Sequence, residues 1–428
     1  MRNRKTTVDR VQNFILLLLS CSALALLFKL PLLSGSLDAR LQSLLTVSPA
    51  AVQQQSQDLT GLIDAVHLVS TGDSEYGRYS QLYLSADSAA FLEIYPLFRE
   101  ALGSSVEMGA TADLTLQEAL DTPSLYLDLT APLPPQVVNA WLGESAGGEW
   151  TDFGQDVRAL ALTTEESAAT LYLLGGDGAI FRYETALPAA AVQEAARGFA
   201  PNGGSFAFES SYSPLAPYTV LASSLSPLPE ISAGLPGGYT AYNLLTALDF
   251  NAHTNSRYSE QGGAEVVVGS PGTLRIATDG TVSYTGEPEA VSELYQVPSA
   301  GEAPTSLELL ASVRQLVSAL TEGTGASPLY LHAISEEEGT YTVSFRYQQG
   351  GIPVVFPDGT DALSVTIQDG TITAFTYRCR SYAAAERTAA LLPPAMAIAI
   401  ASLRPGAGLS LGYVDNGAES LSPRWLAG

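Results

Sequence analysis

The chain has few cysteines and, beyond its first residues, no lysine. Its two cysteines are Cys21 and Cys379. Cys21 falls in an apolar run that we expect to lie in a membrane, so Cys379 has no partner for an intrachain disulfide. The remainder must be stabilised by burial of apolar side chains, and a hydrophobic content of 46% is sufficient for about two or three cores.

Basic residues are scarce after Lys29, and all of those that follow are arginines. The whole chain has 44 Asp and Glu against 20 Lys and Arg, and five of those bases lie in the first 35 residues beside a single acid. The remaining chain is therefore strongly acidic. Such a domain is repelled by nucleic acid and by anionic lipid surfaces, which excludes nucleic acid as a partner.

Histidine is also rare, which limits the chemistry available. His67, His253 and His332 have no metal-binding spacing, and we interpret them as structural. The stretch from Asp358 to Asp361 lacks the remaining ligands of a calcium loop. No glycine-rich phosphate loop is present. We expect no metal, no cofactor and no catalytic residues.

One pattern suggests an enzyme. Residues 143–147 match G-x-S-x-G, with Ser145 at its centre. A nucleophile elbow requires a buried strand before the serine and a helix after it. Here residues 137–142 are predicted to be helical behind Pro134 and Pro135, and a turn is predicted to follow. We interpret the motif as a loop and the chain as a non-enzyme, with an anchored hydrolase as the least favoured alternative.

The longest apolar run is residues 14–33, of which residues 14–28 contain no charge, glycine or proline. About twenty residues are enough for a helix to cross a bilayer. The run predicts a single transmembrane helix. Basic residues precede it (Arg2, Arg4, Lys5 and Arg10), so we expect a cytoplasmic N-terminus and an extracytoplasmic remainder at the cell membrane.

Two alternatives stay open for this run. A cleaved signal peptide shares the basic start and apolar middle, and Ser34-Gly35-Ser36 offers small residues for cleavage. A lipoprotein signal ending at Cys21 fits less well, because the apolar residues continue beyond it. Within the predicted helix, Leu18, Cys21, Ser22 and Ala25 share one face, and small residues there allow close packing of another transmembrane helix. We take these four residues as a hypothetical partner contact.

Asp-Gly pairs between apolar alternating segments predict three β-hairpins, at residues 177–178, 279–280 and 369–370. For the last we predict a two-residue turn that pairs Ile367 with Ile372 and Val365 with Ala374. Helices are predicted between the hairpins, over residues 188–199, 239–248, 306–320 and 383–392. In the third of these helices, the inward side chains are expected to be Leu307, Leu310, Val313 and Leu320.

The predicted fold class is α+β, with a single N-terminal transmembrane helix and about three exterior modules of helix and antiparallel sheet. Gly- and Pro-rich breaks set the boundaries. The expected parts are a cytoplasmic N-terminus (1–13), the transmembrane helix (14–33), a juxtamembrane tether or helix (34–60), a first domain (61–200), a central domain (201–300) and a C-terminal domain (301–428).

Residues 343–354, VSFRYQQGGIPV, are the most specific segment of the chain. They resemble the F-R-x-Y-x-x-G-x-P-V region of the YycH family of two-component-system regulators and the related YycI proteins. Arg346 and Tyr347 are adjacent here, and Gly351 is an extra glycine. Residues 180–185 and 248–284 resemble other parts of that family.

The resemblance implies an extracytoplasmic, membrane-anchored protein that regulates a WalK-type sensor histidine kinase, and with it cell-envelope homeostasis, by protein–protein contact. A YycI-like membrane protein is the implied second partner. The alternative is an anchored exterior module that binds a ligand or a wall component and has no kinase partner. The two differ in what should co-purify with the chain.

Overall fold

The computed structural model describes residues 63, 67–74, 77–83, 89–143, 147–199, 204–209, 215–222, 227–251, 253, 255–286, 292–404, 406 and 408–427. All of them belong to one compact unit, Ser56–Gly428. The predicted transmembrane segment, with Leu18, Cys21, Ser22 and Ala25, lies outside the described residues. Among the residues described, none of the helices combines the length and apolarity needed to span a membrane.

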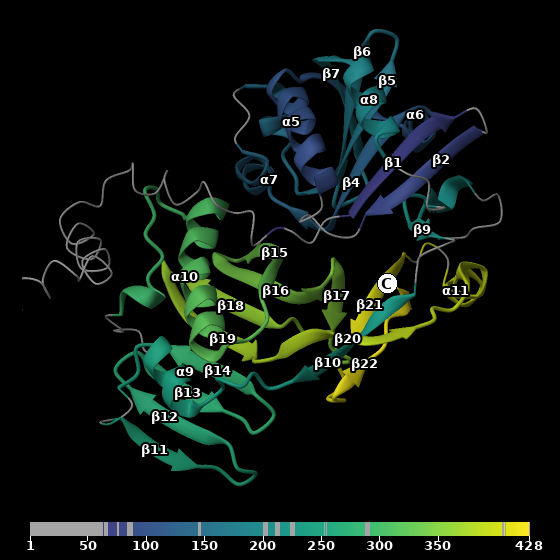
Figure 1. Ribbon diagram of the computed structural model, residues 1–428. Coiled ribbons are helices and arrows are strands. Elements are labelled where there is room, and N and C mark those ends of the chain that lie inside the picture. The colour runs from purple at the N-terminus through teal and green to yellow at the C-terminus, as the bar shows by residue number, and fades with distance from the viewer. Residues whose placement is uncertain are drawn as a thin grey trace, which may run out of the picture. The chain divides into compact units, whose positions relative to one another are not determined.

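The described chain is a mixture of helices and mainly antiparallel sheet (Figure 1), as the sequence predicts. The helices are α5 (Ala89–Gly103), α6 (Asp113–Leu120), α7 (Pro135–Trp141), α8 (Ala189–Arg197), α9 (Ala241–Ala247), α10 (Ser306–Thr324) and α11 (Pro394–Ala401). Short 3₁₀ turns are η1 (Glu149–Asp152), η2 (Ala207–Glu209) and η3 (Glu293–Tyr295). Helices α8, α9 and α10 confirm three of the predicted helices.

The first sheet has nine strands in the order β3-β7-β6-β5-β4-β1-β2-β8-β9. Its strands are β1 (His67–Ser74), β2 (Gly77–Tyr83), β3 (Val106–Thr111), β4 (Ser124–Leu133), β5 (Val157–Glu165), β6 (Ala168–Gly175), β7 (Ile180–Pro188), β8 (Gly204–Phe206) and β9 (Val220–Ala222). Neighbouring strands are antiparallel, as Leu127 opposite Leu160 illustrates.

Alternation along these strands separates the two faces of the first sheet. In β4, Leu125, Leu127 and Leu129 face one core, which also contains α5, α7 and α8 residues. Tyr126 faces the other core, with Leu116 of α6. Because side chains alternate with period two, Asp128 falls on the Tyr126 face. This places a carboxylate on the face that α6 covers.

The second sheet follows the order β11-β12-β13-β14-β19-β18-β16-β17-β21-β23, with β15 also paired to β16. Its strands are β11 (Ser256–Ser259), β12 (Glu265–Gly269), β13 (Gly272–Ile276), β14 (Thr281–Gly286), β15 (Leu329–Glu337), β16 (Thr340–Gln349), β17 (Ile352–Val355), β18 (Leu363–Gln368), β19 (Thr371–Arg378), β21 (Leu409–Val414) and β23 (Arg424–Ala427). Among these pairs, β17 and β21 are parallel.

Helix α10 packs along this second sheet (Figure 1). Thr305 caps its N-terminus, because the Thr305 hydroxyl accepts from the Glu308 N–H while the Glu308 carboxylate accepts from the Thr305 N–H. The helix ends at Gly325, whose φ is 72°. Leu310, Val313 and Leu320 are buried as predicted, and the predicted inward Leu307 is partly buried against the same core.

The predicted helix over residues 383–392 is wrong. Residues Ser381–Ala389 form strand β20, which pairs with β10 (Leu228–Gly234), and β10 pairs on its other side with β22 (Ser420–Leu421). The alanine-rich sequence favours a helix locally, but pairing with β10 and burial of Tyr382 outweigh that small preference. Helix α11 begins just beyond, at Pro394, and was not predicted.

The three Asp-Gly hairpins form, with two turn types. Asp369 and Gly370 both have positive φ, 49° and 68°, as a two-residue type I′ turn requires. At the other two sites only Gly178 and Gly280 have positive φ, and the loops are longer. The predicted Ile367–Ile372 pair is confirmed. The predicted Val365–Ala374 pair is wrong, because a bulge after Thr366 shifts the register and pairs Val365 with Phe375.

Candidate functional site

A cavity of about 620 Å³ opens on the α6 face of the first sheet. Its lining is mostly apolar, with a small number of polar side chains. The charged side chains and the histidine come from β1, β4, β5 and the start of α6. The remaining wall comes from β6 and the turn after it, residues 216–219, β9, β17, β21 and β23. Small-molecule sites in proteins fall between about 300 and 1,000 Å³ and share this composition. The cavity is therefore our candidate site.

Strand pairing brings the polar residues of the cavity together. His67 of β1 lies directly opposite Asp128 of β4, and Asp128 lies opposite Ala159 of β5. Arg158 is the neighbour of Ala159, and its guanidinium Nη1 donates to Asp128 Oδ1. Three positions far apart in the sequence thus become one cluster, because β1, β4 and β5 are adjacent strands.

The backbone at this cluster is irregular. The β4–β5 register shifts between Asp128 and Leu133, and Thr130 within that shift has a φ of 61°. The Asp128 Oδ1 atom also accepts from the Thr130 N–H at 2.8 Å, so the carboxylate stabilises the turn of the bulge. Bulges of this kind redirect side chains and are frequent beside binding sites. Here the bulge sets the position of the Asp128–Arg158 pair.

The ion pair is only partly shielded from water. The side chain of Asp128 is 17% exposed and that of Arg158 is 36% exposed. Burial lowers the pKa of Arg158, but the charge of Asp128 and its hydrogen bond raise that pKa more, so the net direction is upward. The guanidinium is therefore charged at any physiological pH, and Asp128 is its counter-ion.

His67 is held in its neutral form beside this pair. Burial lowers its pKa, and the partial compensation from Asp128 and from a hydrogen bond to Gly351 is too small to reverse the effect. Burial likewise raises the pKa of Tyr126, so its hydroxyl stays protonated. With both groups neutral, the charges of the cluster are those of Asp128 and Arg158, and a further carboxylate, Asp113, lines the cavity.

Aromatic rings form one side of the cavity. Tyr126 is stacked on Tyr218 with ring centroids 6.4 Å apart and packs edge-on against Phe206 at 5.2 Å. The Tyr218 hydroxyl donates to the Asp113 carbonyl oxygen. Trp425 of β23 also lines the cavity. These rings provide an apolar surface next to a fixed ion pair, an arrangement suited to binding an amphipathic molecule.

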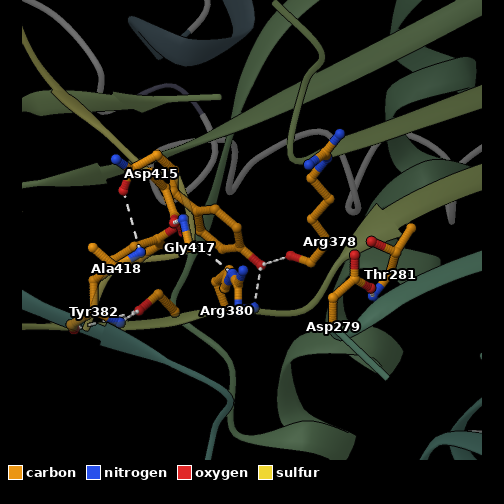
Figure 2. A network of polar contacts seen from close by, with 11 residues as sticks. Asp279, Thr281, Arg378, Arg380, Tyr382, Asp415, Gly417 and Ala418 are labelled. Carbon is orange, nitrogen blue, oxygen red and sulfur yellow. Dashed lines mark hydrogen bonds and ion pairs between the residues drawn. The ribbon is translucent and has the colours of Figure 1, made fainter. Parts of the chain in front are cut away.

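A second polar cluster is structural (Figure 2). The Asp415 side chain is fully buried, and its Oδ2 accepts from the Tyr382 hydroxyl at 2.7 Å and lies 3.2 Å from Arg380 Nε. Its Oδ1 accepts from the Gly417 N–H at 2.8 Å. Both oxygens are thus engaged by the protein itself. The network connects β20 to the residue that follows β21, and it has no part in the cavity lining.

Helix α11 exposes large apolar side chains. Met396 is 55% exposed, Ile400 is 59% exposed, and Leu403 beyond the helix end is 82% exposed. Met396 and Ile400, four residues apart, lie on one side of the helix, and Leu403 follows in the turn after it. Ala397 and Ala401 lie about 100° further round the helix and are buried against Leu409 and neighbouring residues. The helix is anchored by its small residues and presents its large ones to solvent.

The residues that the sequence singled out for possible chemistry are Ser145 and the three histidines, and of those that the structure describes only His67 lines the cavity. Ser145 lies outside the described residues, and the segment before it is helix α7 rather than a strand. His332 lies in β15, and His253 is exposed in a loop. Within the described ranges, no three His, Cys, Asp or Glu side chains are grouped as a metal site would need. From the sequence, His67 was interpreted as structural, and Asp128 and Arg158 were not identified. The available signal was Asp128, a charged residue inside the apolar strand Ser124–Leu133.

The segment with the family resemblance forms the β16–β17 hairpin. Gly350 and Gly351 occupy its turn with φ of 57° and 77°. Tyr347 is buried, and its hydroxyl donates to the Arg378 carbonyl oxygen at 2.7 Å. Arg346 pairs with Asp361 at 2.8 Å. In this protein these residues stabilise the second sheet.

Comparison of the chain with protein-family models, with curated proteins and with solved structures finds no match.

Proposed function

We propose that this chain is a membrane-anchored extracytoplasmic regulator of a WalK-type sensor histidine kinase and acts by contact with the kinase and a YycI-like membrane protein. The transmembrane helix (14–33) anchors it, and the three exterior modules, expected over residues 61–200, 201–300 and 301–428, present the contact surface. The protein is not an enzyme. Its effect on envelope homeostasis comes from binding alone.

The observation that carries this proposal is the apolar side of α11. A contiguous group of exposed apolar side chains on a soluble surface is typical of a site that another protein covers. Met396, Ile400 and Leu403 form such a group on an otherwise acidic domain. The family resemblance of residues 343–354 supports the choice of partner, and the cavity, which offers a fixed ion pair, supports a binding role.

Co-purification tests the proposal. The full chain, tagged and extracted from membranes of its host in detergent, should bring down a sensor kinase and a second single-pass membrane protein. Replacing Met396, Ile400 and Leu403 by serine should reduce kinase recovery at least tenfold, while the membrane level of the protein is unchanged. The control triple variant places serine at exposed apolar positions elsewhere (Val106, Met108 and Leu114). Recovery of wall material without a kinase would contradict the proposal.

The cavity favours a second candidate function, an anchored module that captures an exported ligand or a wall component. Its volume, its apolar walls and its partly exposed ion pair support this role. The two functions are compatible in one chain, since the cavity and the exposed side of α11 use different residues.

A further inference from the structure

We propose that the cavity binds a small zwitterion, a molecule with a free ammonium group and a free carboxylate group on an apolar body, such as a hydrophobic amino acid or a short peptide of such residues. The inference rests on the second candidate function and specifies its ligand class. It does not depend on a kinase partner.

The first argument is the unused hydrogen-bonding capacity of the ion pair. An arginine has five N–H donors, and a carboxylate accepts at two oxygens. Among the described residues, the Arg158 guanidinium bonds to Asp128 through Nη1 only, and Asp128 uses Oδ1 for both its contacts. Arg158 Nε and Nη2 and Asp128 Oδ2 are left for a ligand. One guanidinium edge can hold a carboxylate in a bidentate pair, and the free carboxylate oxygen can accept from an ammonium.

The second argument is charge. A ligand with only a carboxylate would meet Arg158 but also the negative charges of Asp128 and Asp113. A ligand with only an ammonium would meet the positive charge of Arg158. A zwitterion places each charge beside its opposite, so it alone gains from both. Because His67 is neutral in this environment, it adds a polar contact without disturbing that balance.

The third argument is the rest of the lining. Leu174, Val220, Leu409 and Leu411 face the cavity together with the aromatic rings of Tyr126 and Tyr218. Burial of apolar ligand surface against these walls supplies the favourable free energy, and the ion pair supplies orientation. The volume of about 620 Å³ accommodates a peptide larger than a single residue.

The test is calorimetry on the full chain in detergent with leucyl-leucine as the probe. Its N-acetylated form lacks the ammonium, and its carboxamide form lacks the carboxylate. We expect leucyl-leucine to bind and both blocked forms to bind at least tenfold more weakly. Absence of binding by leucyl-leucine and by free leucine would overturn the proposal. So would equal binding of either blocked form.

Variants connect each charge to its residue. Asp128→Asn should weaken the binding of leucyl-leucine and abolish the discrimination against its N-acetylated form. Arg158→Gln should abolish the discrimination against the carboxamide. The matched control is Asp361→Asn, which breaks an ion pair of similar exposure (21% for Asp361) whose two residues do not line the cavity, and it should leave binding unchanged.

A further variant preserves both charges. Val220→Trp fills the cavity and should abolish binding while Asp128 and Arg158 remain paired. Retention of wild-type binding by Val220→Trp would overturn the placement of the ligand in this cavity, even if the charge variants failed to fold. Kinase recovery in the co-purification is measured separately, so failure of the calorimetry leaves the regulator proposal standing or falling on its own result.

Discussion

The Nε2 atom of His67 lies 3.1 Å from the carbonyl oxygen of Gly351, 284 positions away in the sequence. A carbonyl oxygen can only accept, so His67 donates from Nε2 and, when neutral, keeps Nδ1 as an acceptor. The contact connects β1 of the first sheet to the β16–β17 turn of the second. It also fixes the imidazole at the edge of the cavity, beside Asp128.

His332 should make the fold sensitive to acid. Burial, and then the positive charge of Arg346, lower its pKa to about 4, below the usual value of 6.5. The unfolded chain therefore binds more protons than the folded chain as the pH falls from 6.5 to about 4, and the free energy of unfolding decreases over that window. His332→Gln should remove part of this decrease, on the order of 1 kcal/mol for a partly buried group.

Urea unfolding at pH 7, 6 and 5 measures this effect. His253→Gln is the control, since His253 is exposed in a loop. If the stability of His332→Gln and of wild type fell in parallel between pH 7 and pH 5, the assignment would be wrong.

Two glycines with the same backbone conformation should respond differently to substitution. Gly178 and Gly280 have φ of 88° and 87°, where any side chain is strained by about 1 kcal/mol or more. A Cβ at Gly178 meets nothing within 4 Å, whereas at Gly280 it would lie 2.3 Å from Leu235 Cδ2 and 2.9 Å from the Cys379 carbonyl oxygen. Gly280→Ala should therefore destabilise by at least a further ~1–3 kcal/mol.

Thermal unfolding of Gly178→Ala and Gly280→Ala distinguishes backbone strain, which both variants share, from steric overlap, which only Gly280→Ala introduces. Gly280→Val should likewise lower the melting temperature more than Gly370→Val does, because a Cβ at Gly370 approaches the Val297 carbonyl oxygen only to 3.4 Å. Equal losses for Gly178→Ala and Gly280→Ala would show that the neighbours of Gly280 move aside freely.

The Asp415 network should be important for stability. Tyr382→Phe removes the hydroxyl that donates to Asp415 Oδ2 and leaves a fully buried carboxylate with fewer partners. A loss of about 1–3 kcal/mol is expected in the free energy of unfolding. Tyr341→Phe is the control, since its hydroxyl has no hydrogen-bond partner within the described part of the chain. A difference below about 0.5 kcal/mol between the two variants would contradict this role.

The predicted transmembrane face can be tested in cells. Cys21→Leu with Ala25→Leu keeps the segment apolar, so insertion should survive, but close packing against another helix is lost. We expect altered kinase output from a target promoter at a normal level of membrane-inserted protein. Leu18 and Ser22, on the same face, stay unchanged in this variant. Unaltered output, in a strain where deletion of the whole protein does change it, would move regulation to the exterior domains.

Local signals in the sequence were sufficient for some elements and insufficient for others. Thr305 and Glu308 form the capping box that begins α10, and Asp369-Gly370 forms the type I′ turn, because both depend on residues a few positions apart. Strand β20 was missed because its alanines favour a helix until β10 pairs with them. Long-range pairing overrides propensities of a few tenths of a kcal/mol per residue.

The cavity depends even more on long-range pairing. Asp128 and Arg158 are thirty positions apart, and they meet because β4 and β5 pair with a bulge at Thr130. A charged residue within the apolar strand Ser124–Leu133 was visible in the sequence, but its partner was not. The wall from β17, β21 and β23 depends on which strands pair in the second sheet, and residue patterns alone do not specify that order.

The order of strands in the sheets also determines when the protein can finish folding. Strand β10 pairs with β20 and β22, and β17 pairs with β16 and β21, so one partner of each strand is synthesised much later than the strand itself. Synthesis runs from the N-terminus, and until residues 409–421 emerge both earlier strands have an unpaired edge. The nascent chain is therefore open to proteases and to pairing with other chains until β21 and β22 are made. Truncations that remove residues 409–421 should be removed by quality control rather than accumulate as partly active protein.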